Sequence, residues 1–296
     1  MDRHVEDKVE LLRPTGWVDY ELLDSGEGAK LERFGAYVLE RPEQEAIWRR
    51  SLPSEDWARA DAVFGRPAGG GEPTWMLRRR VPARWQMRYR DLTFWCELTP
   101  FRHTGVFPEQ AANWLWIRRV IGAAGRPVRV LNLFGYTALS TLAAAAAGAA
   151  VTYVDASRPS LAWARENQMA SGLADRPIRW IHDDALKFVR REVRRGVRYD
   201  GIVMDPPVFG RGPKGEIWRF HSSFPPLLET CCQVLSPEPL FVLVNAYAVG
   251  ASSTMLRNVV ADAMSRLGGW VVAGELLLVQ KTPAPDGSER VLSTGI

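Results

Sequence analysis

From about Arg126 onward, short apolar runs alternate with longer segments of helical spacing. The apolar runs predict buried strands of a parallel sheet over 128–133, 151–154, 178–181, 199–204 and 240–244. The segments between and after them predict helices over 137–147, 160–171, 185–195, part of 220–234, and 254–267. Regular alternation of strand and helix is typical of a doubly wound α/β sheet, and we expect one here.

The two ends of the chain have a different pattern. Val271–Lys281 and Arg290–Thr294 flank TPAPDGSE, whose Pro and Asp-Gly residues are typical of a turn, so we expect the mostly parallel sheet to end in an antiparallel hairpin. The first 100 residues show short apolar runs around the Asp24–Gly28 turn and a loop at Gly69–Gly71. We therefore expect a small β-rich N-terminal extension over 1–100 and an α/β domain over 101–296.

A polar residue ends each of the first four predicted strands: Asn132, Asp155, Asp184 and Asp205. The carboxyl ends of parallel strands share an edge, and open α/β sheets bind ligands outside that edge. Asp155 lies where an acid takes ribose hydroxyls in a βαβ unit, and Asp183 or Asp184 could receive the amino group of an adenine. Each acid alone could instead cap a helix, as Asp184 could before ALKFVRR. Four in register are much harder to explain as caps.

The turn after the first strand, LNLFGYTALS, lacks the G-x-G-x-x-G fingerprint of a dinucleotide site, so a pyrophosphate is a poor ligand for it. Asn132 offers a polar group, and Gly135 allows the backbone to approach a ligand closely. Thr137 begins a helix whose free amides favour a carboxylate. A ligand with an amino-acid carboxylate, a ribose and an adenine, but no phosphate, fits these groups. S-adenosylmethionine is such a ligand.

The fourth strand leads into YDGIVMDPPVFGRG. Asp205 follows its apolar run, and Pro206 and Pro207 fix the backbone and remove two donors, which leaves carbonyl oxygens to accept hydrogen bonds from another molecule. An ordinary strand-ending turn would use the same residue types. We interpret the segment as a rigid cluster of acceptors beside the ligand.

Composition narrows the class of protein. Hydrophobic residues make up 46% and charged residues 24% of the chain, as in ordinary globular proteins. No uninterrupted apolar run reaches about 18 residues, and Met1–Leu11 lacks the apolar core of a secretion signal. We therefore expect a cytoplasmic protein with no membrane partner. Cys96, Cys231 and Cys232 have neither metal-ligand spacing nor disulfide density, which favours reduced thiols and no metal.

Arginine is concentrated in two segments, although the net charge of +4 is modest. The first cluster is interleaved with Trp75, Trp85 and Tyr89 and contains Arg78, Arg79, Arg80, Arg84, Arg88 and Arg90. The second contains Arg190, Arg191, Arg194, Arg195 and Arg198. Arginines beside aromatic residues suit phosphates and unstacked bases. A solvated surface explains each cluster about equally well.

Four motifs carry a resemblance to a known family. They are HTGVFPEQ (103–110), VLNLFGYTALS (130–140), VDAS (154–157), and DPPVF (205–209) with Lys214 downstream. Residues 101–296 resemble class I S-adenosylmethionine-dependent methyltransferases, and the motifs resemble those of the bacterial 23S rRNA methyltransferases of the cytosine-C5 and guanine-N7 group. The resemblance implies a Rossmann-like fold, S-adenosylmethionine as cofactor and ribosomal RNA as partner.

The resemblance also implies roles for individual residues. The cofactor-binding set is Phe107, Gln110, Asn132, Phe134, Gly135, Thr137, Asp155, Ala156, Ser157 and Asp184. The set that faces the methyl-accepting base is Asp205, Pro206, Phe209 and Lys214.

The chain departs from the family in two places. Cytosine-C5 enzymes need a cysteine nucleophile, because C5 reacts only after a thiolate adds to the ring. That cysteine typically follows the fifth strand, where this chain has VNAYAVG (244–250) instead. The N-terminal extension does not look like the usual RNA-binding domain, although its arginines could serve. Our leading hypothesis is methylation of an RNA base without a cysteine nucleophile. The alternatives are a protein or small-molecule substrate, or a non-catalytic module that binds S-adenosylmethionine or RNA.

Overall fold

A computed structural model describes residues 8–296 and divides into two compact units. The α/β unit contains Lys8–Leu12, Asn113–Glu275 and Gly295–Ile296. The β-rich unit contains Arg13–Ala112 and Leu276–Thr294. The units therefore do not divide at residue 100, and the chain returns to the β-rich unit near its end. Local pattern could not reveal this return, because contacts distant in sequence hold it.

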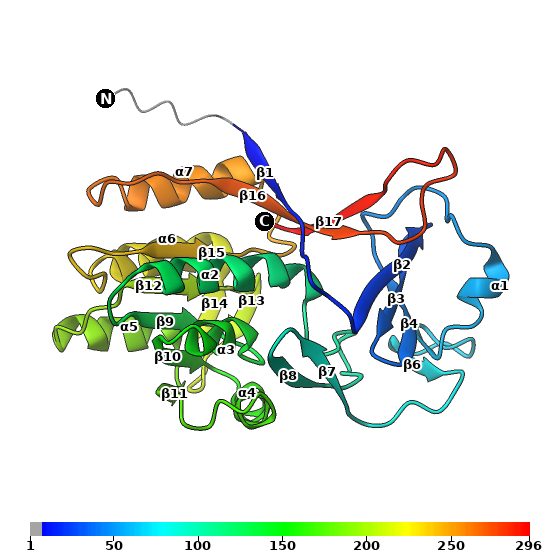
Figure 1. Ribbon diagram of the computed structural model, residues 1–296, viewed down its shortest axis with the longest axis horizontal. Coiled ribbons are helices and arrows are strands. Elements are labelled where there is room, and N and C mark those ends of the chain that lie inside the picture. Colours follow the sequence, from blue (N-terminus) through cyan, green and yellow to red (C-terminus); the bar gives the residue numbers. More distant parts are fainter. Residues whose placement is uncertain (1–7) are drawn as a thin grey trace. The chain divides into compact units, whose positions relative to one another are not determined.

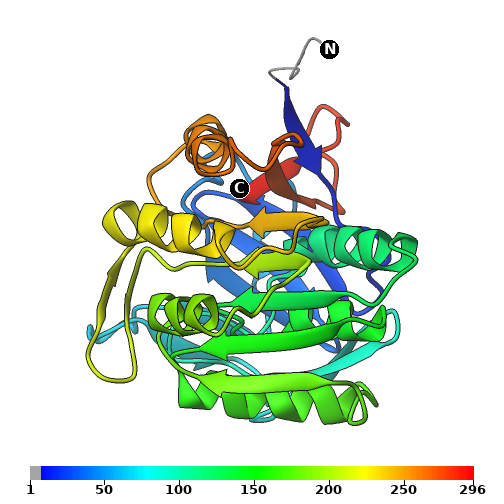
Figure 2. The same ribbon diagram turned by 90° about the vertical axis from the view of Figure 1, so that its left-hand side faces the viewer.

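The centre of the α/β unit is a five-stranded sheet in the order β11-β10-β9-β12-β15. Its strands are β9 (Arg129–Leu133), β10 (Ala150–Asp155), β11 (Ile178–His182), β12 (Gly201–Met204) and β15 (Phe241–Val244). All neighbouring pairs are parallel (Figure 2). The chain moves outward from β9 in one direction and then returns to β12 on its other side. This reversal is the switch point at which open α/β sheets bind ligands, and it confirms the predicted doubly wound sheet.

Helices cover both faces of the sheet (Figure 1). They are α2 (Ala111–Ala123), α3 (Leu139–Ala146), α4 (Arg158–Ala170), α5 (Ala185–Arg194), α6 (Phe220–Cys232) and α7 (Ser253–Ala263). Successive side chains of a strand point to opposite faces. Thus Leu131 packs in one cluster with residues of α5, α6 and α7, whereas Val130 packs in another with residues of α2 and α3. Helix α4 begins earlier than the expected start at residue 160, since its N-cap is Ser157.

The last two strands correct one expectation. β16 (Ala273–Val279) and β17 (Val291–Gly295) do not extend the parallel sheet but form a three-stranded sheet with β1 (Val9–Leu12), in the order β1-β16-β17. One link to the parallel sheet exists just beyond β15, where Ala246 and Ile296 exchange two backbone hydrogen bonds of 2.7 and 3.1 Å. Such an exchange is the pattern of an antiparallel pair. The expected antiparallel extension is thus reduced to a single pair of residues.

The β-rich unit confirms the extended structure expected near the N-terminus. A five-stranded sheet has the order β2-β3-β4-β5-β6 and contains β2 (Tyr20–Gly26), β3 (Ala29–Phe34), β4 (Tyr37–Pro42), β5 (Ala62–Gly65) and β6 (Thr74–Leu77). The remaining elements are the helix α1 (Ser54–Trp57), the hairpin of β7 (Trp85–Tyr89) and β8 (Leu92–Cys96), and the 3-10 helix η1 (Pro108–Gln110). The late return of the chain is fastened to β2, because Lys281 N donates to Leu22 O at 2.8 Å and Ser25 Oγ donates to Gln280 at 2.6 Å.

Among residues 8–296, no helix has both the length and the apolar character needed to cross a membrane.

Candidate cofactor and substrate site

The parallel sheet brings the four predicted polar residues to one edge. Asn132 lies in β9 and Asp155 ends β10, while Asp184 and Asp205 follow β11 and β12. Backbone hydrogen bonds align these ends: Asp183 N donates to Asp155 O at 3.1 Å, and Asp205 N donates to Leu133 O at 3.4 Å. The carboxyl edge of the sheet is therefore where the predicted site residues of the α/β unit gather.

The loop after β9 has an unusual backbone. Phe134, Tyr136 and Ala138 have φ angles of 57°, 46° and 71°, although none of them is glycine. A left-handed conformation costs a residue with a side chain about 1–3 kcal/mol and persists only where the surroundings enforce it, commonly at ligand sites. The sequence carried no sign of this strain, because the loop's single glycine, Gly135, is not one of the residues with positive φ.

Hydrogen bonds from β10 hold this loop in place. The Asp155 carboxylate accepts from Tyr136 N at 2.9 Å and from Ser157 N at 2.7 Å. The hydroxyl of Tyr153 donates to Tyr136 O at 2.6 Å. Burial raises the pKa of Asp155 above its ordinary value, while the N–H groups of Ser157 and Tyr136 act in the opposite direction. Asp155 therefore organises the turn that carries the candidate cofactor residues.

The structure gives Gly135 a packing role that the sequence did not indicate. A Cβ atom at this position would lie 2.2 Å from Cε2 of Tyr153, so the packing of that ring against the backbone requires glycine. Asn132 is buried, and its amide donates to Thr141 Oγ1 at 2.8 Å, which fastens β9 to α3. Thr137 is also buried and precedes α3 by one residue, Ala138, which is the N-cap. These residues shape the turn whatever they contribute to a ligand.

The second part of the edge lies at the start of α5. Asp184 is the N-cap of that helix, because its Oδ1 accepts from Lys187 N at 2.9 Å. Among residues 8–296, Oδ2 of Asp184 has no protein donor, so the cap leaves one oxygen for a ligand. Asp183 is occupied differently: it accepts from Asp184 N at 2.8 Å and pairs with Arg191. The nearby carbonyl of Ala156 lies 2.8 Å from Nε2 of His182.

The Asp-Pro-Pro turn is more closely held than expected. Pro206 is buried, and the carbonyl of Pro207 accepts from the indole of Trp218 at 2.6 Å. Only part of the predicted acceptor cluster is therefore open to another molecule, since Pro207 is already used. The Trp218 ring also packs on Phe134, with ring centroids 4.8 Å apart. Trp218 thus connects the turn after β12 with the strained loop after β9.

A hairpin that pattern analysis missed follows this turn. β13 (Phe209–Arg211) and β14 (Ile217–Arg219) pair antiparallel around a turn that contains Lys214. Phe209 is 52% and Ile217 59% exposed, and the Arg219 guanidinium carbon lies 5.9 Å from the centroid of the Phe209 ring. The alternation in VFGR and EIWR on either side of GPKG could have revealed two short strands. Exposed aromatic and cationic side chains thus stand on the hairpin that follows the turn of Asp205.

None of the three cysteines lies in a loop at this edge. Cys96 belongs to the β-rich unit, and Cys231 and Cys232 end α6, which leads away from the carboxyl edge. Burial raises the pKa of all three thiols, which disfavours the thiolate. After β15, Asn245 is buried and accepts a hydrogen bond from Asn113 at 2.8 Å. The segment after β15, where the resemblance led us to look for a cysteine, thus holds a buried polar pair.

Phe107 and Gln110, the remaining predicted cofactor residues, belong to the β-rich unit. Phe107 packs on His103, with ring centroids 5.2 Å apart, and Gln110 is buried in η1. Burial, followed by the charge of Arg41, lowers the pKa of His103 to about 4. The HTGVFPEQ segment is therefore a packed element of this unit.

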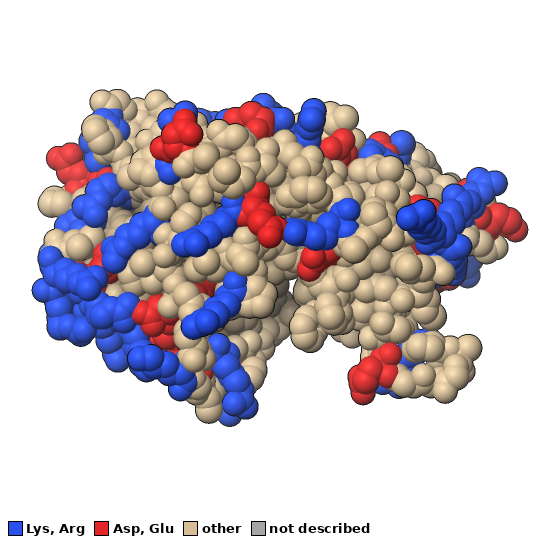
Figure 3. All heavy atoms as spheres, turned by 90° about the horizontal axis from the view of Figure 1, so that it is seen from below, with Lys and Arg blue, Asp and Glu red and all other residues tan. Residues whose placement is uncertain are grey.

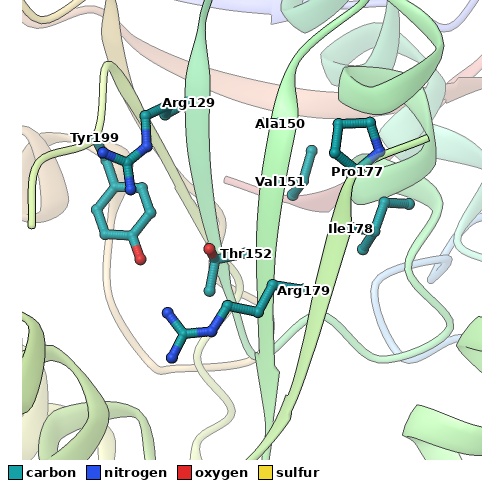
Figure 4. A pocket seen from close by; sticks show the side chains of 8 residues that line it. All are labelled: Arg129, Ala150, Val151, Thr152, Pro177, Ile178, Arg179 and Tyr199. Atoms are coloured by element: carbon teal, nitrogen blue, oxygen red, sulfur yellow. The ribbon is translucent and has the colours of Figure 1, made fainter.

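A pocket of about 340 Å³ lies at the other end of the sheet (Figure 4). Its lining comes from the beginnings of β9, β10 and β11 and from Tyr199, which lies two residues before β12. The residues are Arg129, Ala150, Val151, Thr152, Pro177, Ile178, Arg179 and Tyr199. It is separate from the carboxyl edge. No group of three or more His, Cys, Asp or Glu side chains within residues 8–296 is arranged to hold a metal ion.

Comparison with known proteins identifies the family. The family model of S-adenosylmethionine-dependent methyltransferases matches residues 70–266, well over half of the chain. The chain belongs to this family. S-adenosylmethionine is accordingly its cofactor, and the predicted resemblance is confirmed.

Solved structures agree over nearly the whole chain. A SAM-dependent methyltransferase from Agrobacterium tumefaciens is 43% identical, with a TM-score of 0.89 over 97% of this chain and 94% of that one. A proposed SAM-dependent methyltransferase from Streptococcus mutans is 17% identical, with a TM-score of 0.66 over 95% of this chain and 76% of that one, and shows the fold alone. The predicted Rossmann-like fold with a β-rich region is therefore confirmed.

A curated relative gives a more specific name over a shorter region. Ribosomal RNA large subunit methyltransferase K/L from Shewanella sp. (strain ANA-3) is 34% identical over 158 residues. The match covers 51% of this chain and 21% of the relative, so the chain spans about a fifth of the length of the curated relatives it matches.

Proposed function

We propose that the chain transfers the methyl group of S-adenosylmethionine to a base of RNA, with large-subunit ribosomal RNA as the first candidate. The observation that carries this proposal is the exposed β13–β14 hairpin beside Asp205. An exposed aromatic ring with arginine against it suits a base taken out of its stack, and nearby cations suit phosphates. The name of the Shewanella relative supports a ribosomal substrate.

The hydrogen-bond acceptors at the carboxyl edge support this choice of cofactor. S-adenosylmethionine supplies an electrophilic methyl group when bound. Asp155 would accept the ribose hydroxyls through the lone pairs that its two backbone donors leave, and Oδ2 of Asp184 would accept the adenine amino group. The strained loop and the N-terminus of α3 would surround the methionine end. The rest of the proposed cofactor set, from the family resemblance, is Phe107, Gln110, Asn132, Phe134, Gly135, Thr137, Ala156 and Ser157.

The substrate base would be oriented by the turn after β12. Asp205 and the carbonyl of Pro206 would accept hydrogen bonds from an amino or ring N–H group of the base, which directs its lone pair toward the methyl group. Positioning of this kind accelerates transfer without a covalent intermediate. Phe209 would stack on the base, and Lys214 would contact a phosphate. This chemistry uses no thiolate.

Mass spectrometry of ribosomal RNA from a strain that lacks the gene tests the proposal. We expect one methylated nucleotide to be lost and to return when the wild-type gene is supplied. The Asp205→Ala variant should not restore it, whereas Arg119→Glu, an exposed change on α2, should. If no ribosomal methyl group changes while the purified protein binds S-adenosylmethionine, the substrate is a protein or small molecule, or the chain is a non-catalytic module.

A further inference from the structure

One face of α5 is a continuous row of cations. Lysine and arginine residues recur three or four positions apart and therefore project from the same side of the helix. They are Lys187, Arg190, Arg191, Arg194 and Arg195, with Arg198 just beyond the helix end. The opposite face is buried through Phe188 and Val189. The ten-residue helix that carries the row is about 15 Å long.

The charge balance of this region stands out from the rest of the chain. Residues 176–198 contain eight Arg and Lys against three Asp and Glu, a net charge of +5, whereas the whole chain carries +4. Lys and Arg side chains gather at the left-hand end of the face shown in Figure 3, the end at which α5 lies in Figure 1. Seven of the eight cations are arginine, whose planar fork matches phosphate oxygens.

Acids lie close to part of each arginine cluster. In the β-rich unit, Arg78 pairs with Glu40 at 3.7 Å, and Arg79 pairs with Asp61 at 3.7 Å. On α5, Arg190 and Arg194 are exposed and have no acidic partner among residues 8–296. Cations that lack acidic partners are the ones available to an anionic ligand.

The other three cations of the row, Lys187, Arg191 and Arg195, pair with acids that hold them in position. Glu192 is fully buried, yet it accepts hydrogen bonds from Arg179 at 3.3 Å, from Arg195 at 3.1 Å and from Tyr199 at 2.8 Å. One negative charge thus holds two arginines in place. At the other end of α5, Lys187 pairs with Glu216, which belongs to the β13–β14 hairpin.

The two ends of the row lie beside two different features of the α/β unit. It begins beside the hairpin of the proposed substrate site and ends near the pocket at the amino ends of the strands. Figure 4 shows Arg129 and Arg179 on either side of Thr152 at that pocket. Arg179 already pairs with Glu192 at 3.3 Å, so Arg129 is the guanidinium group at this pocket that a phosphate would meet.

We propose that the cationic face of α5, together with Arg129 at the pocket, binds the phosphate backbone of the RNA substrate. The inference rests on the proposed function and adds the path of the strand: from the hairpin, along α5, to the far end of the sheet. Phosphate contacts fix the register of an RNA without reading its sequence. The face would thus hold the strand while the hairpin receives the base.

Fluorescence anisotropy with a fluorescein-labelled, single-stranded 20-nucleotide RNA of mixed sequence tests this path. The test variant combines Arg190→Glu with Arg194→Glu. The matched control combines Arg119→Glu with Arg266→Glu, which makes the same change in net charge at exposed positions elsewhere in the α/β unit. We expect the test variant to lose at least about tenfold in affinity at low salt, and its log–log salt slope to become shallower by roughly 1.4, for two phosphates.

Calorimetry with S-adenosylmethionine should give wild-type affinity for both variants, which shows that the fold is intact. If the glutamate variant does not fold, the Arg190→Gln, Arg194→Gln variant replaces it, with the same direction of effect expected. Equal RNA affinity of test and control variants would overturn the proposed path, and the ribosomal RNA analysis above would still decide the methylation proposal. An absence of RNA binding by the wild-type protein would overturn the path as well.

Discussion

The loop after β9 and the hairpin after β12 leave the same edge of the sheet, yet the first is drawn inward by hydrogen bonds and the second extends into solvent. Tyr136 in the loop is held by Asp155 and Tyr153, whereas Phe209 in the hairpin is half exposed. Under the proposed function the loop holds the cofactor, and a backbone that is already organised lowers the entropic cost of binding it. A large substrate needs accessible groups. The two halves of the site therefore should respond differently to substitution.

Loss of the hairpin's substrate groups should have the largest effect. Asp205→Ala combined with Phe209→Ala removes the proposed acceptor and stacking surface, so we expect methyl transfer to fall by about 10²–10⁴-fold or more. Affinity for S-adenosylmethionine should be unchanged. Transfer of tritium from labelled cofactor to ribosomal RNA of the deletion strain measures the first quantity, and calorimetry measures the second. A parallel loss of cofactor affinity would mean that the two halves are not separable.

Asp155→Ala should act on the other half. The change removes the proposed ribose acceptor and leaves Tyr136 N without its partner, so cofactor binding should weaken by about 1–3 kcal/mol. Asp155→Asn retains an acceptor and should lose less. Titration calorimetry on all three proteins provides the comparison. Wild-type affinity in the alanine variant would place the ribose contact elsewhere.

Gly135→Ala separates packing from ligand contact. Its new methyl group would collide with the Tyr153 ring, so the free energy of unfolding should fall by about 1–3 kcal/mol even without cofactor. In a Tyr153→Leu background the same change should cost less, because the ring is gone. Urea denaturation of the four proteins yields the coupling energy. Equal costs in both backgrounds would show that Tyr153 is not the reason for glycine.

The cysteines should have the smallest effect. Combined Cys96→Ala, Cys231→Ala and Cys232→Ala substitutions should leave methyl transfer nearly at the wild-type rate, since no thiol lies in the edge loops. RNA that contains 5-fluorocytosine should form no covalent adduct, as gel electrophoresis under denaturing conditions would show. An adduct on one of these cysteines, with activity lost in that cysteine's variant, would restore cytosine C5 as the target atom.

The hydrophobic pattern of the sequence predicted some of these features and not others. Periodicity identified β9 to β12 and the helices between them, because each needs only local contrast between apolar and polar positions. The register of parallel strands then placed Asp155 and Asp205 on one edge. The packing reason for Gly135 could not be predicted from local pattern, because the ring that requires it, Tyr153, lies on another strand. The strained backbone of the loop could not be predicted either, because Phe134 and Tyr136 are not residues that favour positive φ.

Trp218 has a consequence for how the two halves communicate. Its ring rests on Phe134 of the loop, and its indole N–H donates to Pro207 of the turn. A ligand that displaces Phe134 must therefore also shift Trp218, the residue that holds the Asp-Pro-Pro turn. Under the proposed function, displacement of Phe134 by the cofactor would give cofactor binding and substrate binding a shared free-energy term, and thermodynamic reciprocity requires each to change the affinity of the other by the same factor. Trp218 would then couple the binding of donor and acceptor through the fold itself.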